Sequence, residues 1–125
     1  MFYKLAFLAL AGAAGTLLRY GLAGVVQRIQ GTSFPWGTLL VNLSGCFLAG
    51  LFWALFESRW PVSPETRTVI MVGFMGAFTT FSAFILESGE LMRSAEWMST
   101  FANLAAQNVF GFLALFAGFA LARVL

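Results

Sequence analysis

Four long apolar runs, separated by short polar segments, constrain this chain more than any other feature. We predict membrane-spanning helices over residues 5–26, 37–56, 68–92 and 99–124. A helix needs about 20 apolar residues to cross the core of a bilayer, and each run has that length. Because 60% of the 125 residues are hydrophobic and 10% are charged, a soluble domain of this size could not bury them. The sequence therefore predicts an all-α membrane protein with one four-helix domain over residues 1–125.

The composition excludes several classes of function. The chain has no histidine, no aspartate and one cysteine, which removes His-based catalysis, Cys/His zinc sites and an intrachain disulfide. No nucleophile–base pair or metal-binding cluster indicates an enzyme. A net charge of +2, spread along the chain, does not indicate nucleic-acid binding. We therefore expect either a function inside the bilayer or a role as an assembly subunit.

The loop charges define the orientation weakly. With four spans, both termini lie on one side of the membrane, together with Lys4, Arg59, Arg67 and Arg123. The other side holds fewer cations, since only Arg28 and Arg93 belong to it, joined by Arg19 if that side chain reaches the surface. The positive-inside rule acts through such differences, and this one is small. Two interpretations stay open: one weakly specified topology, or insertion both ways followed by antiparallel pairing.

Two charged residues fall within predicted spans, where each costs about 2.5–3.5 kcal/mol on insertion scales. Arg19 lies two-thirds along the first run. It either extends its stem to the interface or forms an electropositive vestibule for anions. Glu87 lies late in the third run, where it is either an interfacial carboxylate or part of an ion pathway. The sequence alone does not separate these roles.

The third run contains an unusual segment, residues 73–84, with the sequence GFMGAFTTFSAF. Two glycines followed by two threonines weaken a helix midway along a span. A break at that depth frees backbone carbonyls, which must be buried or bind an ion such as Na⁺. The alternative is a continuous helix in which the threonine hydroxyls bond to the preceding turn.

Uncharged groups that suit a small anion surround this segment. Phe81 and Phe84 are three residues apart on one helical face, and Thr80 and Ser82 carry hydroxyls beside them. The positive edge of a phenyl ring can contact an anion that has shed water, and the hydroxyls or the Asn42 amide can replace part of its hydration. The alternative is structural, with the rings facing lipid and Asn42 bonding a neighbouring helix.

Taken in order, these segments resemble the small dual-topology fluoride channels, the Fluc or CrcB family. The resemblance covers the whole chain. It rests on GTLLR at residues 15–19, PWGTLLVN at 35–42 and GFMGAFTTFSAF at 73–84, followed by Glu87.

The resemblance implies an antiparallel, dual-topology homodimer in the bacterial inner membrane, with a third helix broken near its middle. It implies a passive fluoride exporter with two pores between the subunits. Its partners would be fluoride, a second identical subunit and the lipid bilayer. It assigns the pore to Asn42, Phe81, Phe84, Thr80, Ser82 and Glu87, a structural Na⁺ to the backbone carbonyls of Gly76 and Thr79, and the vestibule to Arg19.

The chain departs from the family pattern at two places. Ala83 stands where members commonly carry threonine or serine, so one hydroxyl of the usual polar track is absent. In the fourth run, Asn108 and Phe112 flank Gly111 where many members place small hydroxyl residues, so Gln107 or Asn108 is a candidate replacement donor. A small multidrug-type, proton-coupled exporter is the alternative function, although such exporters use a carboxylate in the first helix and this one has none.

Overall fold

The computed structural model describes residues 2–125, and these residues form helices without any β-strand. Four segments of 23 to 30 residues are long and apolar enough to cross a membrane. This confirms the prediction of an all-helical protein and is compatible with a membrane protein. The shortest of them spans about 34 Å at 1.5 Å per residue, more than the core of a bilayer. In chain order the elements are α1 (Phe2–Gln30), α2 (Trp36–Ser58), α3 (Pro64–Thr68), η1 (Val69–Phe74), α4 (Met75–Phe78), α5 (Phe81–Arg93) and α6 (Trp97–Val124).

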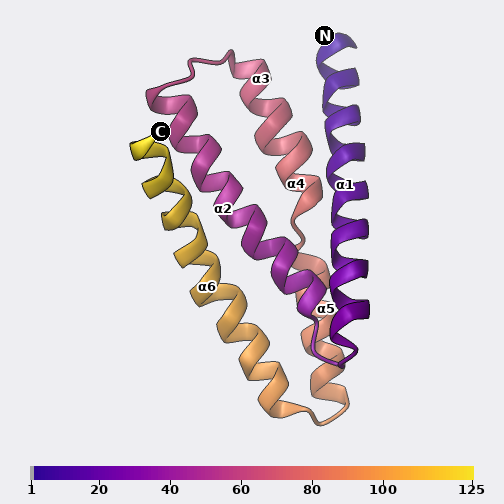
Figure 1. Cartoon of the computed structure of the whole chain (residues 1–125). Helices are drawn as coiled ribbons and strands as arrows, with labels where there is room; N and C mark the ends of the chain where they lie inside the picture. Colours follow the sequence, from indigo (N-terminus) through magenta and orange to yellow (C-terminus); the bar gives the residue numbers. More distant parts are fainter. Residues whose placement is uncertain (1) are drawn as a thin grey trace.

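The long helices run up and down along one another (Figure 1). Both chain ends lie at one end of the molecule, and the connections between α1 and α2 and between α5 and α6 lie at the other. The third long segment, Pro64–Arg93, is built from α3, η1, α4 and α5 in succession. The observed boundaries differ from the predicted ones by four residues at most; α1, for example, covers Phe2–Gln30 where 5–26 was expected.

Close packing of α2 against α6 depends on two glycines. A Cβ atom added to Gly50 would overlap the carbonyl oxygen of Leu115, and one added to Gly118 would overlap that of Phe47. Without side chains at these two positions, the two helix backbones touch directly. Small residues commonly allow this kind of approach between membrane helices, where no hydrophobic effect drives association.

We expect Gly50→Ala to destabilise the protein, because the added methyl group must push α6 away from α2. Overpacking of this kind costs about 1–3 kcal/mol. Thermal unfolding of purified protein in detergent would measure the loss as a lower Tm. Gly21→Ala is the matched control, because an added Cβ there meets no atom within 4 Å and alanine favours a helix. Equal Tm values for the two variants would contradict the close approach of α2 and α6.

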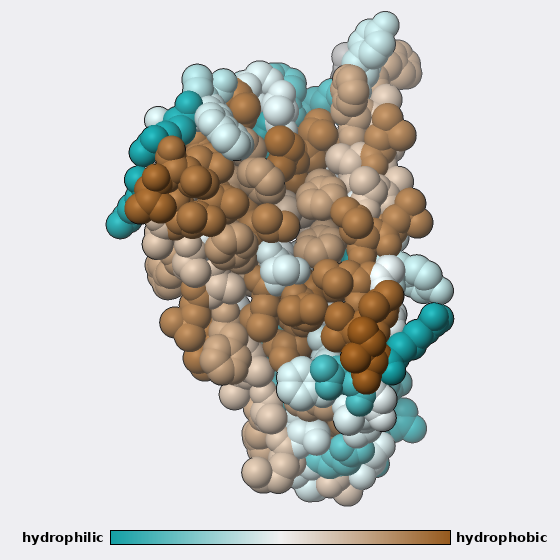
Figure 2. Space-filling model, viewed as in Figure 1, coloured by the Kyte–Doolittle hydropathy of each residue, from teal (hydrophilic) through white to brown (hydrophobic). Residues whose placement is uncertain are grey.

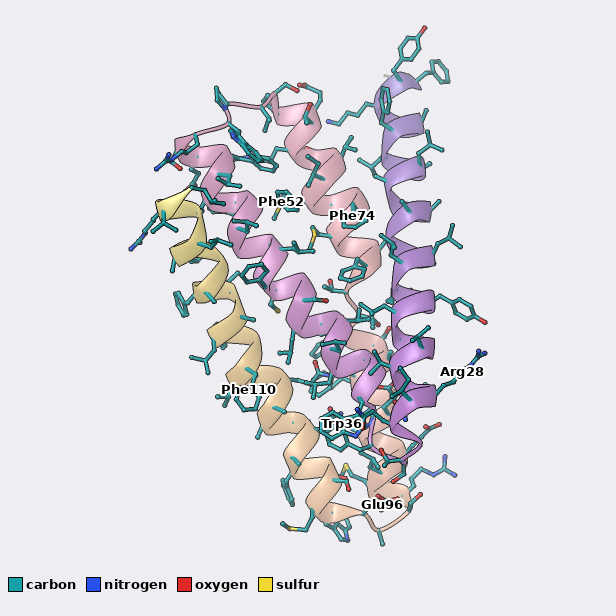
Figure 3. All side chains as sticks on the ribbon, in the orientation of Figure 1. Arg28, Trp36, Phe52, Phe74, Glu96 and Phe110 are labelled. Atoms are coloured by element: carbon teal, nitrogen blue, oxygen red, sulfur yellow. The ribbon has the colours of Figure 1, made fainter. Side chains whose placement is uncertain are left out.

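The buried core lies between α2 and the third long segment. Val41, Met75 and Phe78 are buried, and partly buried residues from both sides pack on them. Phe52 on α2 and Phe74 on η1 belong to this second group, and Figure 3 shows them on the two helices that border the core. This core holds the irregular third segment against α2.

Most of the remaining surface is apolar. α1 buries only Gly15 among its 29 residues, and many large hydrophobic side chains on α5 and α6 are exposed. Figure 2 shows a broad apolar surface between hydrophilic regions at the two ends of the molecule. This pattern suits a bilayer, which solvates the middle of the helices while water solvates the ends.

The third long segment is interrupted near its middle. η1 is a six-residue π-helix, a form that is rare and often associated with functional sites. α4 ends at Phe78, and the next two residues, Thr79 and Thr80, have extended backbone angles. The Thr80 hydroxyl then caps α5 by accepting the N–H of Ala83 at 3.2 Å. We call Thr79 and Thr80 the break.

Candidate functional site

The break leaves backbone groups of α4 without helical partners. In a continuous helix the carbonyl of Gly76 would accept the N–H of Thr80, but that N–H donates to Oδ1 of Asn42 at 2.8 Å. Among the described residues, no hydrogen bond is recorded to the carbonyls of Gly76, Phe78 or Thr79. The C-terminal end of α4 therefore presents free carbonyl oxygens, which attract a cation.

The opposite polarity occurs at the start of α5. The N–H groups of Phe81 and Ser82 begin this helix, and neither has a recorded partner within residues 2–125. The N-terminus of a helix attracts anions through such free N–H groups and through the helix dipole. The break thus places a carbonyl-rich end and an N–H-rich end two residues apart.

Asn42 of α2 bridges the break with its side-chain amide. Its Oδ1 accepts from the Thr80 N–H, and its Nδ2 donates to the Thr80 carbonyl at 2.9 Å. The second Nδ2 proton goes to Oε1 of Gln107 on α6 at 3.0 Å. Asn42 therefore joins α2, the break and α6, and both of its N–H groups are engaged with protein acceptors.

Arg19 of α1 contacts the same region from the other side. Its Nε donates to the carbonyl of Ala77 at 3.1 Å, which pairs another of the carbonyls freed at the end of α4. A cation near the C-terminus of a helix is stabilised by the helix dipole. The sequence did not indicate this contact, because it depends on how α1 packs against α4.

Phe81 and Phe84 lie edge to face beside the break. Their ring centroids are 5.7 Å apart and the ring planes are inclined by 64°. Phe84 is 5% exposed, whereas Phe81 is 74% exposed. A cavity of about 310 Å³, which we call the Phe cavity, adjoins them. It is bordered by Asn42, Gly45, Cys46, Ala49, Met75, Thr79, Thr80, Phe81, Phe84, Gln107 and Asn108.

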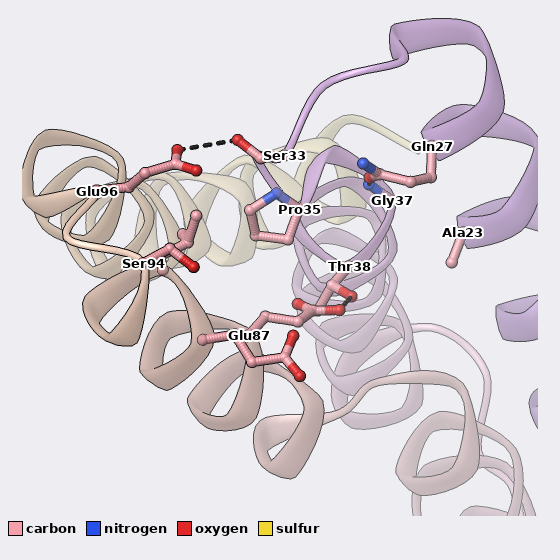
Figure 4. A pocket seen from close by; sticks show the side chains of 11 residues that line it. Ala23, Gln27, Ser33, Pro35, Gly37, Thr38, Glu87, Ser94 and Glu96 are labelled. Carbon is pink, nitrogen blue, oxygen red and sulfur yellow. Dashed lines mark hydrogen bonds between the residues drawn. The ribbon is translucent and has the colours of Figure 1, made fainter.

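Two further cavities continue from the break toward one end of the molecule. The first, of about 380 Å³, shares Thr80 with the Phe cavity and is also bordered by Arg19, Ala83 and Glu87. The second, of about 380 Å³, shares Glu87 and opens beside the connections between helices (Figure 4). Neighbouring cavities share bordering residues, so the three cavities follow one another from the rings to the molecular end. We call them the polar series, after the polar residues Thr80, Arg19 and Glu87 that border them.

Glu87 and its contacts lie along this series. The Thr38 hydroxyl of α2 donates to Oε1 of Glu87 at 2.6 Å, and Oε2 is buried without a partner in the described part of the chain. Ser33 donates to Glu96 at 2.9 Å nearer the end, as Figure 4 shows. Glu87 is therefore half-buried between helices. It does not border the Phe cavity.

The structure divides the polar residues of α6 into separate environments. Asn103 is fully buried, and its Nδ2 donates to Ser88 of α5 at 3.0 Å. Gln107 instead contacts α2 through Asn42. Asn108 is exposed and donates to Leu104 of its own helix at 2.7 Å. Helical periodicity places Asn103 and Gln107 on one face, but this face is shared between two neighbouring helices.

The predicted site residues lie around the break, although not all of them border one cavity. Asn42, Thr79, Thr80, Phe81 and Phe84 border the Phe cavity. Ser82 is exposed beyond it, with its hydroxyl 3.5 Å from that of Thr80. The sequence missed Gln107 as the partner of Asn42, Thr38 as the partner of Glu87, and the carbonyl of Ala77 as an acceptor for Arg19.

Comparison with known proteins agrees with this arrangement. The family model described as "CrcB-like protein, Camphor Resistance (CrcB)" matches residues 6–119. The chain belongs to the CrcB family. Within this family, proteins from Desulforapulum autotrophicum and Solidesulfovibrio magneticus are 61% and 54% identical to the chain, and one from Nitrosococcus oceani is 49% identical. Each match covers the full length of both chains, and each relative is named a fluoride-specific ion channel FluC.

Proposed function

We propose that this protein is a fluoride-selective channel that lets fluoride leave the cytoplasm passively. The observation that carries the proposal is the full-length identity of 49–61% to three relatives named fluoride-specific ion channels. The cavity beside the break supports it, because phenyl rings, amides and hydroxyls gather there without any charged residue. An ion channel of this kind is not an enzyme.

The chemistry of the Phe cavity suits a small anion that has lost part of its water. The edges of Phe81 and Phe84 carry partial positive charge, and the Thr80 hydroxyl and the free N–H groups at the start of α5 can donate hydrogen bonds. None of these groups carries a full charge, so binding stays weak enough for the ion to leave. We assign Asn42, Phe81, Phe84, Thr80, Ser82 and Glu87 to the pathway, with Arg19 drawing anions to the cavities beside it.

The carbonyls at the end of α4 fit a structural Na⁺. Those of Gly76 and Thr79 have no recorded partner among residues 2–125. A Cβ atom at Gly76 would meet nothing within 4 Å, so this face of α4 is open. Carbonyl oxygens are suitable ligands for a hard cation. A bound Na⁺ would supply positive charge that neutralises the freed carbonyls and fixes the break.

We propose an antiparallel homodimer of dual topology as the working unit, placed in the bacterial inner membrane as a multi-pass protein. The open face at Gly76 and the exposed ring of Phe81 support this assembly, because both belong to the proposed site and both are uncovered in one subunit. A second copy would enclose the Phe cavity and the carbonyls of the break. The weak charge bias of the loops is compatible with insertion in both orientations.

We expect Na⁺ to stabilise the folded protein, and Li⁺ to do so less well. At a concentration about 100 times its Kd, a ligand of the native state adds about 2.7 kcal/mol of stability. Thermal unfolding and size-exclusion chromatography in Na⁺ or Li⁺ would measure this without any transport assay. A Tm that is equal in Na⁺ and in rigorously Na⁺-free buffer would contradict the cation site.

Fluoride release from loaded proteoliposomes tests the function. Passive release down a gradient, with no need for a proton gradient, supports the channel. The alternative is a small multidrug-type, proton-coupled exporter, which predicts proton-driven uptake of an organic cation instead. α1 carries no carboxylate for such coupling. Uptake of that kind, without fluoride release, would replace the channel by the exporter.

A further inference from the structure

The orientation of the Gln107 amide is determined by a chain of hydrogen bonds that starts at the break. The Thr80 N–H requires an acceptor and the Thr80 carbonyl requires a donor, so Asn42 must present Oδ1 to the first and Nδ2 to the second. The remaining proton of Nδ2 then requires an acceptor, which is Oε1 of Gln107. Nε2 of Gln107 is the last group in this chain of hydrogen bonds, and we call it the free end.

This free end is an unpaired donor inside the protein. Nε2 of Gln107 is buried and has no hydrogen-bond partner among residues 2–125. A buried donor without an acceptor costs about as much as a lost hydrogen bond, and native proteins rarely leave one unpaired. Gln107 also borders the Phe cavity, together with both phenylalanine rings. An acceptor that enters this cavity would therefore lie beside a side chain whose N–H has no competing partner.

The neighbouring amides lack this property. Both N–H groups of Asn42 are engaged, by Thr80 and by Gln107. Asn108 donates to Leu104, and Asn103 donates to Ser88 outside the Phe cavity. Among the amide side chains that border the cavity in the described part of the chain, Gln107 is the one whose donor is both buried and unpaired.

We propose that Gln107 supplies the amide N–H that contacts the anion in the Phe cavity, and that Asn42 is a positioning residue that orients Gln107 and fixes the break. This assignment rests on the proposed function, because it takes fluoride as the anion. It moves the amide contact from Asn42 to Gln107, one of the two candidate replacement donors in the fourth run. Gln107 also replaces a donor in a pathway where Ala83 provides no hydroxyl.

The first test is transport by Gln107→Met, which keeps the size of the side chain and removes its N–H groups. A hydrogen bond to a charged group corresponds to a rate change of about 10- to 100-fold, so we expect fluoride release to fall by that factor. Gln30→Met is the matched control, because Gln30 is exposed at the end of α1 and borders none of the three cavities of the polar series. Release by the control should equal that of the wild type.

The second test detects the contact in the wild-type protein, so it does not depend on the folding of a variant. The chain has three glutamines, Gln27, Gln30 and Gln107, and ¹⁵N-glutamine labelling gives three side-chain amide signals. Labelled alanine carbonyls identify the backbone N–H of Gln107, since it alone of the three follows an alanine. Carbon labelling of glutamine then connects this backbone signal to the side-chain amide of the same residue. We expect fluoride, and not chloride, to shift the Gln107 amide protons while the other two stay in place.

The outcomes separate this assignment from the proposed function. If the wild type conducts fluoride but the Gln107 amide does not respond to it, the donor role is wrong. That holds even if Gln107→Met conducts poorly, since the side chain would then act only by holding Asn42. If the wild type releases no fluoride, the proposed function itself fails and this assignment fails with it. A fluoride-specific shift together with slow release by the variant supports the assignment.

Discussion

Fluoride release by Phe81→Ile is expected to fall by more than about tenfold, equivalent to at least 1.4 kcal/mol of barrier, toward the rate of protein-free liposomes. In the proposed pathway, the ring of Phe81 would offer a positive edge to an anion in the Phe cavity. Isoleucine offers an aliphatic surface of similar hydrophobicity without that polarity. Phe81 is 74% exposed within one subunit, so the exchange leaves the fold of the subunit intact. The defect should therefore appear in transport while each subunit stays folded.

Phe84→Ile is expected to reduce release by a similar factor, with an additional loss of stability. Phe84 is 5% exposed and packs edge to face with Phe81, so the smaller side chain leaves a space beside the break. Phe116→Ile is the control for both variants, because Phe116 is an exposed ring in an edge-to-face pair with Phe119 on α6, outside the Phe cavity. Wild-type release by both Phe81→Ile and Phe84→Ile would remove the rings from the mechanism.

Asn42→Asp is expected to abolish detectable fluoride release and to lower Tm. The substitution keeps the size of the side chain but removes Nδ2, so the Thr80 carbonyl and Oε1 of Gln107 both lose their donor. Each acceptor left without its partner costs about 1–3 kcal/mol. If the new carboxylate ionises, it adds a cost of about 2.5–3.5 kcal/mol inside the bilayer and repels an anion in the adjoining cavity.

A double-mutant cycle would separate the structural part of this effect. Asn42→Leu, Gln107→Leu and the double variant remove the bond between the two amides in three ways. Because these side chains share one hydrogen bond, their effects on Tm should be non-additive, with a coupling of about 0.5–3 kcal/mol. Additive losses would contradict the bond between Asn42 and Gln107. A conducting and stable Asn42→Asp protein would contradict the bridge across the break.

The sequence predicted the spans well, because length and hydropathy decide them. The four runs appear as four long helical segments, and the interruption at Thr79 and Thr80 lies inside the segment where glycine and threonine weaken the helix. The contacts of the break were not predictable from spacing. They depend on how closely α1 and α2 approach it, which places Arg19 on Ala77 and Asn42 on Thr80.

The fourth helix also shows that spacing along the sequence does not predict which helices come into contact. Spacing by four residues placed Asn103 and Gln107 on one face, but it could not indicate that α5 pairs with the first and α2 with the second. The hydrogen bonds of both Asn42 N–H groups could not be predicted either, because they depend on how three separate segments are placed in space. Residue types therefore indicated which groups could contact an anion. The structure indicates which hydrogen-bond donors have no partner within the described residues.

Ion selectivity measured in liposomes tests the central claim most directly. Proteoliposomes would be loaded with equal concentrations of fluoride and chloride. A potassium ionophore would start release by letting K⁺ leave together with the anions, and selective electrodes would follow both anions. We predict rapid release of fluoride and no protein-dependent release of chloride, with the fluoride signal lost in Phe81→Ile. Equal release of both anions, or no release of fluoride from well-folded protein, would contradict the account.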